Sequence, residues 1–467
     1  MGEKPQQIDV PAPVSDVRVE LRVISREEHG ISRKNISQAA LRVLYRLHEA
    51  GYAAYLVGGA VRDLMLGGHP KDFDIATNAT PEQVRGLFRN CRLIGRRFRL
   101  AHVVYGQEIV EVATFRGTGD DGTGDRHLVD GRIVRDNVYG SIEEDAVRRD
   151  FRINALYYNI ADFSVRDYVG GVEDLKKREL HLIGDPEQRY REDPVRMLRA
   201  IRLSAKLGFK IDPSAAEPMR QMGEYLAEAA PARLFDESLK MFLGGDGAKS
   251  FRELERSGLM QFVFPGLAES LANDTDRRVH NLIDAGLAST DERIEADKSV
   301  TPAFLFALLL WEPVRRRANE LFEQGGDIAH AWTRAMHQIV NEQTARVAVP
   351  RRFSVVMEEI WALQPRFEQR IKKRVFRLLA HPRFRAAYDF FALRAKADPE
   401  LAELAQWWLA AQELPHEELA TLLSANGPMP TVSTKTAASP AAKKRRRRRR
   451  KSGAKAGEPT QDESGPA

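Results

Sequence analysis

The pattern of apolar residues changes near residue 185, and this change constrains the fold of the chain more than any other feature. Residues 36–185 mix helical spacing with short apolar runs typical of strands, such as residues 53–57 and 109–115. Residues 186–425 instead keep helical spacing throughout, interrupted by Pro and Gly. The sequence therefore predicts an α+β region followed by an all-α region.

Individual elements can be expected within these two regions. In the first, we expect helices at residues 36–50, 60–66 and 141–155, strands at 53–57, 72–76, 103–105 and 109–115, and a mobile polar loop at 117–136. The helix at 141–155 starts at a capping box formed by Ser141 and Glu144. In the second region, we expect helices at residues 193–208, 230–243, 302–322, 329–347, 354–364, 369–380 and 399–412.

Positive charge is concentrated near the C-terminal end of the sequence. Residues 427–467 carry 11 of the 72 Lys and Arg residues and three of the 66 Asp and Glu residues, so their net charge is +8 and that of residues 1–426 is −2. The consecutive cations at 443–451 repel one another and resist packing. We therefore expect residues 426–467 to form a disordered basic tail.

The composition favours a cytoplasmic protein. A hydrophobic fraction of 43% with 30% charged residues fits a soluble globular chain. The longest uncharged apolar run, residues 301–311, is shorter than the roughly 20 residues of a membrane-spanning helix. Residues 1–11 lack the apolar core of a signal peptide, and Cys91, as the one cysteine in the sequence, can form no intrachain disulfide.

Two aspartates lie at alternate positions of an expected strand. Asp72 and Asp74 would project to one face of this strand, whereas Phe73 and Ile75 would face the core. Two crowded carboxylates favour divalent cations, and oxygen ligands suit Mg²⁺ held together with substrate phosphates. Such a site can activate an attacking hydroxyl and polarise a phosphoryl group. An isolated pair of this kind is more often two solvated acids at the end of a strand.

A glycine pair strengthens the phosphate interpretation. Gly58 and Gly59 lie between an expected strand and an expected helix, where the bare backbone can approach a phosphate and the helix start offers free N–H groups. Arg62 could add a bidentate phosphate contact, and Asp63 could orient it. By itself, a pair of glycines usually marks only a turn.

Two further acids compete for a third position at this site. Glu111 lies in an apolar strand, where it either needs a cation or hydrogen-bond partner or faces solvent. Asp150 lies in an expected helix with Asn154 four residues later on the same face, although an ordinary Arg–Asp surface pair is the alternative.

Arginines recur at spacings of three in the helix that follows Asp193. Arg196, Arg199 and Arg202 would lie along one side of this helix. This side is either a solvated charged face or a binding wall, in which an acid–arginine pair reads a base edge and further arginines contact phosphate. The spacing alone does not choose between them.

Together, these motifs resemble the class II template-independent RNA nucleotidyltransferases, which comprise bacterial poly(A) polymerases and tRNA CCA-adding enzymes. The resemblance rests on G-G-x-x-R-D and D-x-D at residues 58–74, E-V-A-T-F-R at 111–116, R-R-D-F-x-x-N-A at 148–155 and R-E-D-P-V-R-M-L-R-A at 191–200. Residues 91–103, 349–353 and 381–388 look more like the poly(A) polymerases.

The resemblance implies a mixed-sheet catalytic domain similar to the DNA polymerase beta nucleotidyltransferase fold. It divides the chain into an N-terminal extension (1–35), a catalytic head (36–185), a nucleotide-recognition neck (186–260), an RNA-binding body (261–425) and the basic tail (426–467).

The resemblance also implies roles for individual residues. Asp72 and Asp74 would be catalytic carboxylates of a two-metal Mg²⁺ site, Asp150 an active-site residue, and Glu111 a competing third metal-facing acid. The substrate ATP would be held by Gly58, Gly59, Arg62, Asp63, Arg149, Asn154, Asp193, Arg196 and Arg199, with Asp193 and Arg196 as the pair that reads the base. Arg152 stands where the family commonly has Thr, which leaves local ribose or phosphate contacts open.

RNA 3′ ends are the other implied partner. The basic residues expected to bind RNA are Arg351, Arg352, Lys372, Lys373 and Arg374 in the body and Lys443, Lys444 and Arg445 in the tail. A solvated helix face explains the body cluster equally well. We expect a monomer without membrane contact, and protein partners from the RNA-degradation or RNA-chaperone classes.

The predicted function is that of a polynucleotide adenylyltransferase. The 3′-hydroxyl of an RNA would attack the α-phosphate of ATP, add AMP repeatedly without a template and release pyrophosphate, a reaction that in bacteria promotes RNA decay or processing. The nearer alternative is a CCA-adding enzyme, against which residues 96–98 argue. The other alternative is a catalytically silent RNA-binding protein, against which the intact Asp72 and Asp74 pair argues.

Overall fold

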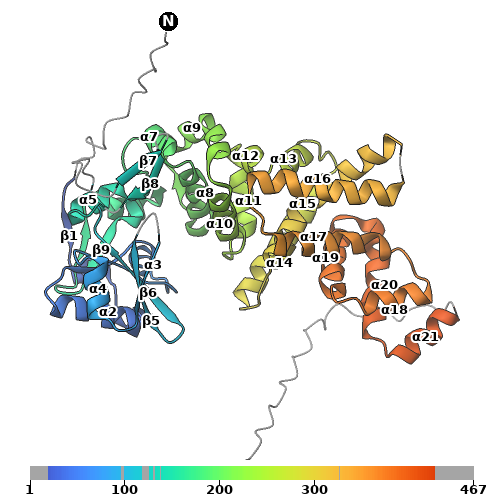
Figure 1. Cartoon of the computed structure of the whole chain (residues 1–467), viewed down its shortest axis with the longest axis horizontal. Coiled ribbons are helices and arrows are strands. Elements are labelled where there is room, and N and C mark those ends of the chain that lie inside the picture. The colour runs from blue at the N-terminus through green and yellow to red at the C-terminus, as the bar shows by residue number, and fades with distance from the viewer. Residues whose placement is uncertain are drawn as a thin grey trace, which may run out of the picture.

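The computed structural model describes residues 19–95, 99–117, 126–129, 132–136, 138–325 and 327–425. A mixed sheet with its helices forms one end of an elongated molecule, and helices build the rest (Figure 1). The predicted α+β region followed by an all-α region is confirmed. Residues 96–98 and the basic tail, with Lys443, Lys444 and Arg445, lie outside the described residues.

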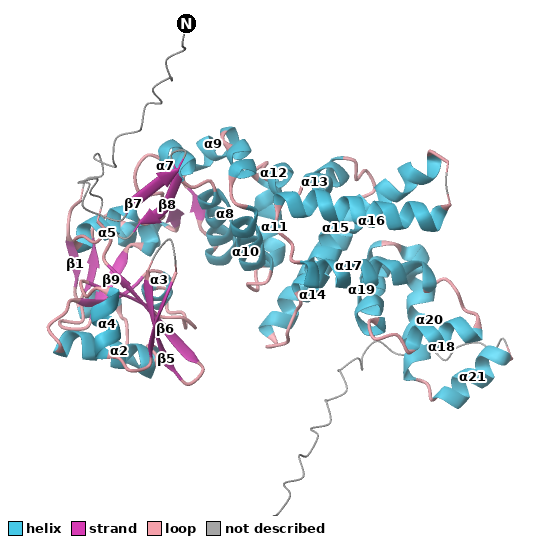
Figure 2. Cartoon of the chain, in the orientation of Figure 1, coloured by secondary structure: helices cyan, strands magenta, loops and turns pink. Residues whose placement is uncertain are grey.

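The strands occupy short segments of the first half of the chain. They are β1 (Arg22–Ile24), β2 (Ala54–Val57), β3 (Asp74–Thr77), β4 (Cys91–Ile94), β5 (Leu100–Tyr105), β6 (Glu108–Thr114), β7 (Arg126–Val129), β8 (Arg132–Asp136), β9 (Leu156–Asn159), β10 (Val165–Asp167), β11 (Glu179–Leu180) and β12 (Lys210–Ile211). Of the described residues, those after Ile211 form only helices and loops (Figure 2).

The helices of the head and neck begin between the strands. They are α1 (Arg26–His29), α2 (Gln38–Glu49), α3 (Gly59–Met65), α4 (Pro81–Leu87), α5 (Ile142–Arg148), α6 (Gly171–Lys177), α7 (Pro186–Glu192), α8 (Val195–Leu207), α9 (Pro213–Gln221), α10 (Pro231–Phe242) and α11 (Gly247–Arg256), with 3-10 turns at Arg33–Asn35, Arg152–Asn154 and Gly223–Glu228.

The remaining helices build the body. They are α12 (Met260–Val263), α13 (Pro265–Ala272), α14 (Arg278–Glu295), α15 (Pro302–Glu323), α16 (Ile328–Arg346), α17 (Arg351–Leu363), α18 (Lys372–Leu379), α19 (Phe384–Ala397), α20 (Ala402–Glu413) and α21 (His416–Ser424), with 3-10 turns at Gln364–Arg366 and Pro399–Leu401. None of the helices in the described ranges is long and apolar enough to cross a membrane.

The main sheet has the strand order β1-β10-β9-β2-β3-β6-β5-β4. β3 and β6 are parallel, and the other neighbouring strands are antiparallel. One face packs on α2, where Val43 and Leu44 share a core with Ile75. The other face carries Tyr55 and Tyr157 in a separate cluster that includes residues of α5. Helices on both faces therefore fix the middle strands, on which the acids lie.

The chain outside the expected head boundary contributes to this sheet. β1 pairs with β10 along the sheet edge, and His29 of α1 bonds through Nε2 to the carbonyl oxygen of Phe163 at 2.8 Å. Residues 22–35 therefore pack as part of the head, although the sequence placed them in an N-terminal extension. Backbone pairing to a distant strand leaves no local sequence pattern that would reveal this.

Two expectations for local structure are wrong. The polar stretch at 117–136 contains the antiparallel strands β7 and β8, in which Val129 pairs with Arg132. The helix that starts at Ser141 ends at Arg148, not near Ala155, because Arg149 is extended with ψ of 168°. The capping box itself is present, with the Glu144 N–H donating to Ser141 Oγ at 3.3 Å.

The C-terminal helices have a core of their own. The Trp361 indole of α17 donates to the Ala307 carbonyl of α15 at 3.0 Å and belongs to the main core. A second cluster around Phe367, Phe391 and Trp408 joins the helices from α18 to α21. The Trp408 indole donates to the Phe367 carbonyl at 2.7 Å, so this unit closes on itself.

His280 provides a test of the packing between α11 and α14. Its Nδ1 lies 2.6 Å from an Asp274 oxygen and its Nε2 2.9 Å from a Glu255 oxygen. Burial alone would lower the pKa of His280, but the hydrogen bonds to Asp274 and Glu255 raise it above 6.5. A folded-state pKa above the unfolded value stabilises the fold below about pH 6.5 and loses this contribution as the pH rises through the folded pKa.

We therefore expect His280→Gln to lower the thermal unfolding midpoint more at pH 6 than at pH 9. Measurement of both proteins by circular dichroism across this range checks the prediction. If the difference in unfolding midpoint between the variant and the parent protein stays constant with pH, the charge of His280 contributes nothing to stability.

Candidate active site

The ends of three neighbouring strands bring the predicted acids together. Asp74 begins β3, lies opposite Val57 of β2 and is paired with Glu111 of β6. Phe73 and Ile75 are buried, whereas Asp72 and Asp74 are exposed, so the alternation expected from the sequence is present. The acids thus lie beside the turn that follows β2.

Electrostatic repulsion characterises this group of acids. Loss of hydration beside the surrounding protein raises the pKa of Asp74 to about 6, the negative charges of Glu111 and Asp72 add to this rise, and Arg149 opposes it. Uncompensated carboxylates are the oxygen ligands that Mg²⁺ prefers, so Asp72 and Asp74 fit a divalent metal. Within the described ranges, no three His, Cys, Asp or Glu side chains converge as a complete ligand set.

Glu111 has a partner of its own on the neighbouring strand. The registers place His102 of β5 beside Glu111, and His102 Nε2 lies 3.1 Å from Glu111 Oε1. This contact turns one carboxylate oxygen of Glu111 toward β5. Glu111 thus acts on Asp74 through its charge while it bonds to His102.

The glycine pair shapes the turn beside the acids. Gly58 caps α3 with φ of 74°, a conformation that L-residues with side chains rarely adopt. A Cβ atom at Gly58 would lie 3.7 Å from Arg149 Nη1, and one at Gly59 would lie 3.4 Å from Arg62 Nη2. The missing side chains therefore leave two guanidinium groups facing this turn.

Arg62 is buried and fully oriented. Its Nε donates to Asp63 Oδ1 at 2.8 Å, and its Nη1 donates to Asn154 Oδ1 at 2.7 Å. Asp63 also accepts from Lys206 of α8 at 3.1 Å. The contact between Arg62 and Asp63 suggested by the sequence is present, and the neck takes part in it through Lys206.

Tertiary contacts shape the Arg-Arg-Asp segment at 148–150. The buried Arg189 side chain of α7 donates through Nη2 to the carbonyls of Arg148 and Arg149, which replaces helical backbone bonds. Burial lowers the pKa of Arg189 to about 10. Ile183 N–H donates to the Asp150 carbonyl at 3.0 Å. These partners explain why α5 ends at Arg148.

Arg149 is held between an acid and a phenol. Its Nη2 donates to Asp145 Oδ2 at 3.0 Å, and its Nε donates to the Tyr157 hydroxyl at 2.9 Å. Burial alone would lower the pKa of Arg149, but Tyr157 and Asp145 raise it above its usual value. Arg149 therefore stays charged beside Gly58 and Asp74.

Asp150 connects the head to the neck. Arg199 of α8 contacts Asp150 Oδ2 through Nε at 2.7 Å and Nη2 at 2.5 Å. Oδ1 accepts from Phe151 N–H at 2.8 Å and from Asn154 Nδ2 at 3.3 Å. Burial alone would raise the pKa of Asp150, but Arg199 and these hydrogen bonds lower it below its usual value. The contact of Asp150 with Asn154 exists, although no helix contains both.

The side chains of Asp193 and Arg196, the pair expected to read the base, have different protein partners. Asp193 makes a bidentate pair with Arg233 of α10, at 2.8 Å to Nη1 and 2.7 Å to Nη2. Arg196 donates to Glu192 at 3.0 Å. The spacing within one helix could not reveal Arg233, because it lies on another helix.

Arg152, at the position where a threonine was expected, points away from the acids. Its Nη1 lies 3.9 Å from Asp174 Oδ1, and its backbone N–H donates to the His181 carbonyl at 3.1 Å. The substitution therefore places its charge at a neighbouring acid cluster.

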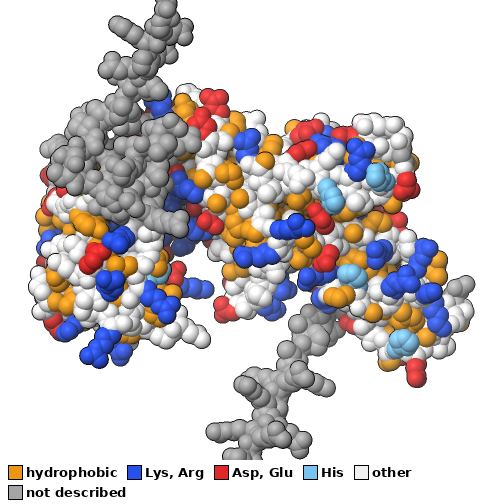
Figure 3. Space-filling view, in the orientation of Figure 1, with side chains coloured by type: hydrophobic (Ala, Val, Ile, Leu, Met, Phe, Trp, Pro, Cys, Tyr) orange, Lys and Arg blue, Asp and Glu red, His pale blue; other side chains and the backbone are white. Residues whose placement is uncertain are grey.

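The candidate RNA-binding residues lie far along the body. Arg351, Arg352, Lys372, Lys373 and Arg374 are exposed on α17 and α18. Lys372 donates to Ser424 at 2.8 Å, and Arg374 to Gln369 at 2.8 Å. Lys and Arg side chains gather over the C-terminal helices on the face shown in Figure 3.

Three residues of this site escaped the sequence analysis. They are Arg189, Lys206 and Arg233, each a cation with a partner distant in the sequence. Arg189 lies two residues before the motif at 191–200. Lys206 and Arg233 carry no comparable signal.

Comparisons with known proteins agree with this geometry. Family models match at residues 54–181 ("Poly A polymerase head domain"), 208–271 ("Probable RNA and SrmB- binding site of polymerase A") and 324–452 ("Polymerase A arginine-rich C-terminus"). Poly(A) polymerase I of Escherichia coli O6:H1 is 52% identical over 398 residues, which cover 84% of this chain and 86% of that protein.

CCA-adding enzymes match less of the sequence. That of Lactobacillus johnsonii is 36% identical over 236 residues, or 50% of this chain and 58% of that protein. The crystal structure of the Bacillus stearothermophilus CCA-adding enzyme in complex with CTP has a TM-score of 0.51 and 26% identity, covering 83% of this chain and 81% of that one. The higher identity to poly(A) polymerase I, over 84% of this chain, decides between the two branches. The chain belongs to the bacterial poly(A) polymerase family of class II template-independent RNA nucleotidyltransferases.

Proposed function

We propose that Asp72 and Asp74 form the catalytic centre at which this chain, as a poly(A) polymerase, adds AMP from ATP to RNA 3′ ends. The observation that carries this assignment is the group of crowded acids beside the Gly58 turn, where the pKa of Asp74 is raised to about 6. Bound there, Mg²⁺ would polarise the α-phosphate of ATP and lower the pKa of the RNA 3′-hydroxyl. The hydroxyl attacks the α-phosphate, and pyrophosphate leaves.

The chain's own residues would hold the nucleotide. Gly58 and Gly59 would let the triphosphate approach the backbone closely. Because they have no side chains, Arg149 and Arg62 face the turn and can contact the phosphates. Arg149 keeps its charge there, and Asn154 orients Arg62 through a 2.7 Å hydrogen bond. A cationic turn next to paired acids suits a substrate that carries both phosphate and metal.

We assign Asp150 to positioning. Both of its oxygens are occupied by Arg199, Phe151 and Asn154, which leaves it poorly suited to bind metal. It instead fixes the segment that carries Arg149 and Asn154 against α8. Between the two acids left open by the sequence, Glu111 is the better candidate for a third metal-facing group, because it is part of the repelling cluster.

Selection of the base is assigned to the neck. Arg233 holds the Asp193 carboxylate in one plane, where it can accept from a base edge, and Arg196 and Arg199 flank it on α8. A site whose buried polar groups need one base edge rejects other bases by leaving those groups unpaired. This supports the selection of ATP.

The remaining parts follow the proposed division into head, neck, body and tail. The family description of residues 208–271 supports an RNA contact and a protein contact there, and the exposed cations of α17 and α18 support a second RNA contact. The proposal also includes RNA-decay or RNA-chaperone proteins as binding partners. It further includes a monomeric state. It also includes a cytoplasmic location, which the lack of a possible intrachain disulfide supports.

Removal of either catalytic acid tests the assignment. We expect Asp72→Asn and Asp74→Asn each to lower AMP incorporation by at least about a hundredfold, because charge stabilisation of this kind supplies several kcal/mol, and to leave RNA affinity nearly unchanged. Extension of a labelled RNA with Mg²⁺ and each nucleoside triphosphate measures this. Glu108→Gln, on the same strand as Glu111, serves as the matched control.

A tRNA lacking its 3′ end serves as a second substrate in the same assay. Long ladders with ATP alone agree with the poly(A) branch. Addition limited to C, C and A, or full activity in both aspartate variants, would contradict the assignment.

Removal of the arginine that orients Asp193 tests base selection. We expect Arg233→Ala to reduce the ratio of kcat/KM for ATP to that for CTP by about tenfold, because loss of a bidentate pair frees the carboxylate at a cost of about 1–3 kcal/mol. Arg233→Lys should restore little of the preference for ATP, since lysine cannot form a bidentate pair with Asp193. A ratio unchanged in a folded Arg233→Ala protein would remove Arg233 from base selection.

A further inference from the structure

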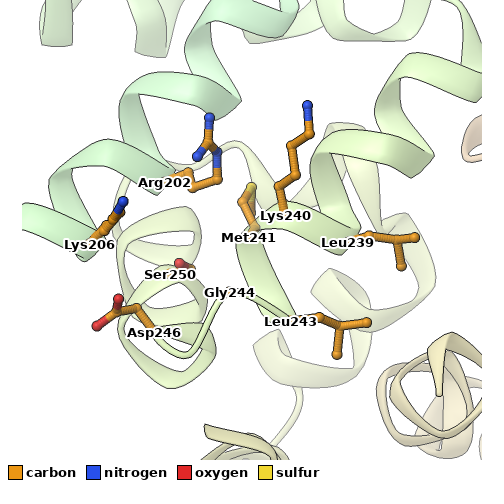
Figure 4. A pocket seen from close by; sticks show the side chains of 9 residues that line it. All are labelled: Arg202, Lys206, Leu239, Lys240, Met241, Leu243, Gly244, Asp246 and Ser250. Atoms are coloured by element: carbon orange, nitrogen blue, oxygen red, sulfur yellow. The ribbon is translucent and has the colours of Figure 1, made fainter. Parts of the chain in front are cut away.

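The neck contains a pocket beside the head contacts and outside the group of acids. Its volume is about 390 Å³, and it is lined by Arg202, Lys206, Leu239, Lys240, Met241, Leu243, Gly244, Asp246 and Ser250 (Figure 4). This volume is within the usual range for small-molecule sites. The lining combines cations with apolar side chains, which is the composition that a nucleotide requires.

Three cations lie on one side of this pocket. Arg202 and Lys240 extend in the same direction from α8 and α10, and Lys206 lies beside them (Figure 4). Arg202 is paired through Nε with Glu237 at 2.6 Å, and Lys206 with Asp63 at 3.1 Å. Lys240 makes no ion pair or hydrogen bond with the described residues, so its charge is available to an anion.

A buried hydroxyl group also lacks a partner at this pocket. Ser250 of α11 is 1% exposed, and its Oγ makes no hydrogen bond with any described group. Leaving a buried hydroxyl unpaired costs about 1–3 kcal/mol, and ligand binding would recover this cost. The neighbouring Leu239, Met241 and Leu243 offer an apolar surface to the same ligand.

The start of α11 does not provide the anion site. Its first N–H groups, at Gly247 and Ala248, donate to the Asp291 carboxylate at 2.8 and 3.0 Å. Asp246 is paired with Lys249 at 2.7 Å. The side chains of Arg202 and Lys240 are therefore the groups that would meet a phosphate.

The pocket continues the contact between the neck and the catalytic head. Arg199, one turn before Arg202 on α8, binds Asp150, and Lys206 at the end of α8 binds Asp63. The same helix thus contacts the segment beside the acids and lines the pocket. Arg202 lies between Arg199 and Lys206 along this helix, so the pocket and the head contacts share α8.

We propose that this pocket binds one nucleotide of the RNA primer, upstream of its reacting 3′ end. Its phosphate lies against Lys240 and Arg202, its ribose and base lie against the apolar residues, and its 2′-hydroxyl bonds to Ser250. The 2′-hydroxyl is both donor and acceptor and distinguishes RNA from DNA. The proposal rests on the proposed function and adds to it a subsite that selects an RNA primer.

Binding measured without catalysis tests the subsite. The full chain is titrated by fluorescence anisotropy with a labelled oligoadenylate RNA and with its DNA counterpart, without ATP or Mg²⁺, over a series of salt concentrations. We expect Lys240→Gln to weaken binding of both by about tenfold and to reduce the slope of log K against log salt by about 0.7. Lys34→Gln, which removes an exposed cation of the head outside the pocket, should change the affinity less.

The Ser250→Ala variant tests the contribution of the hydroxyl group to RNA binding separately from that of the cations. It should weaken binding of RNA about fivefold, leave binding of DNA unchanged, and not lower the thermal unfolding midpoint, because the free protein gives this hydroxyl no partner whose loss would destabilise the fold. In extension assays the same variant should raise the KM for RNA and leave that for ATP unchanged.

Three outcomes overturn the proposal. They are unchanged RNA affinity in both variants, equal loss of RNA and DNA binding in Ser250→Ala, and a raised KM for ATP in place of RNA, which would assign the pocket to a free nucleotide. If the variants change RNA binding as expected but the wild-type protein extends no primer, the proposed function is refuted and the subsite is retained.

Discussion

Ion pairs between the head and the neck hold the active site together. Asp150 and Asp63 belong to the head, and both bind cations of α8, at 2.7 Å to Arg199 and 3.1 Å to Lys206. Asp150 is the more buried acid, and removing Arg199 would leave its charge uncompensated, at a cost of about 3–5 kcal/mol, whereas Lys206 is 45% exposed and its pair with Asp63 contributes less. The geometry of the residues around the Gly58 turn therefore depends on α8, a helix that follows the sheet in the sequence.

These contacts form one hydrogen-bonded chain. Lys206 binds Asp63, which binds Arg62, and Arg62 continues through Asn154 to Asp150 and Arg199. Each polar group in the chain is oriented before substrate arrives, so binding requires little reorganisation. The same chain explains how Arg62 can be buried, because its charge meets a carboxylate and an amide oxygen.

Environment separates the roles of the acids. Asp74 has like charges as neighbours and a pKa raised to about 6, whereas the Arg199 guanidinium holds the pKa of Asp150 below its usual range. An acid that repels its neighbours gains most from a bound cation, and an acid already paired gains little. The environment of Asp74 therefore suits a bound cation, whereas that of Asp150 suits a structural ion pair.

The sequence by itself determined the class of the fold and the local features around Asp72 and Asp74. Period-two alternation placed Asp72 and Asp74 on one face, the glycine pair marked the turn after β2, and the capping box at Ser141 marked the start of α5. These features are local, since a few consecutive residues set backbone conformation and side-chain direction. Periodicity also located most of the long neck and body helices.

Tertiary structure decided the partners. Arg189 ended α5 by binding its last carbonyls, and Arg233 of another helix binds the Asp193 carboxylate. Tertiary packing also brought β1 into the sheet. It left the Ser250 hydroxyl without a hydrogen-bond partner at a pocket built from three helices. Such pairings form between residues that are distant in the sequence but approach within about 3 Å. The packing of the helices and strands against one another sets this distance. Local periodicity carries no information about that packing.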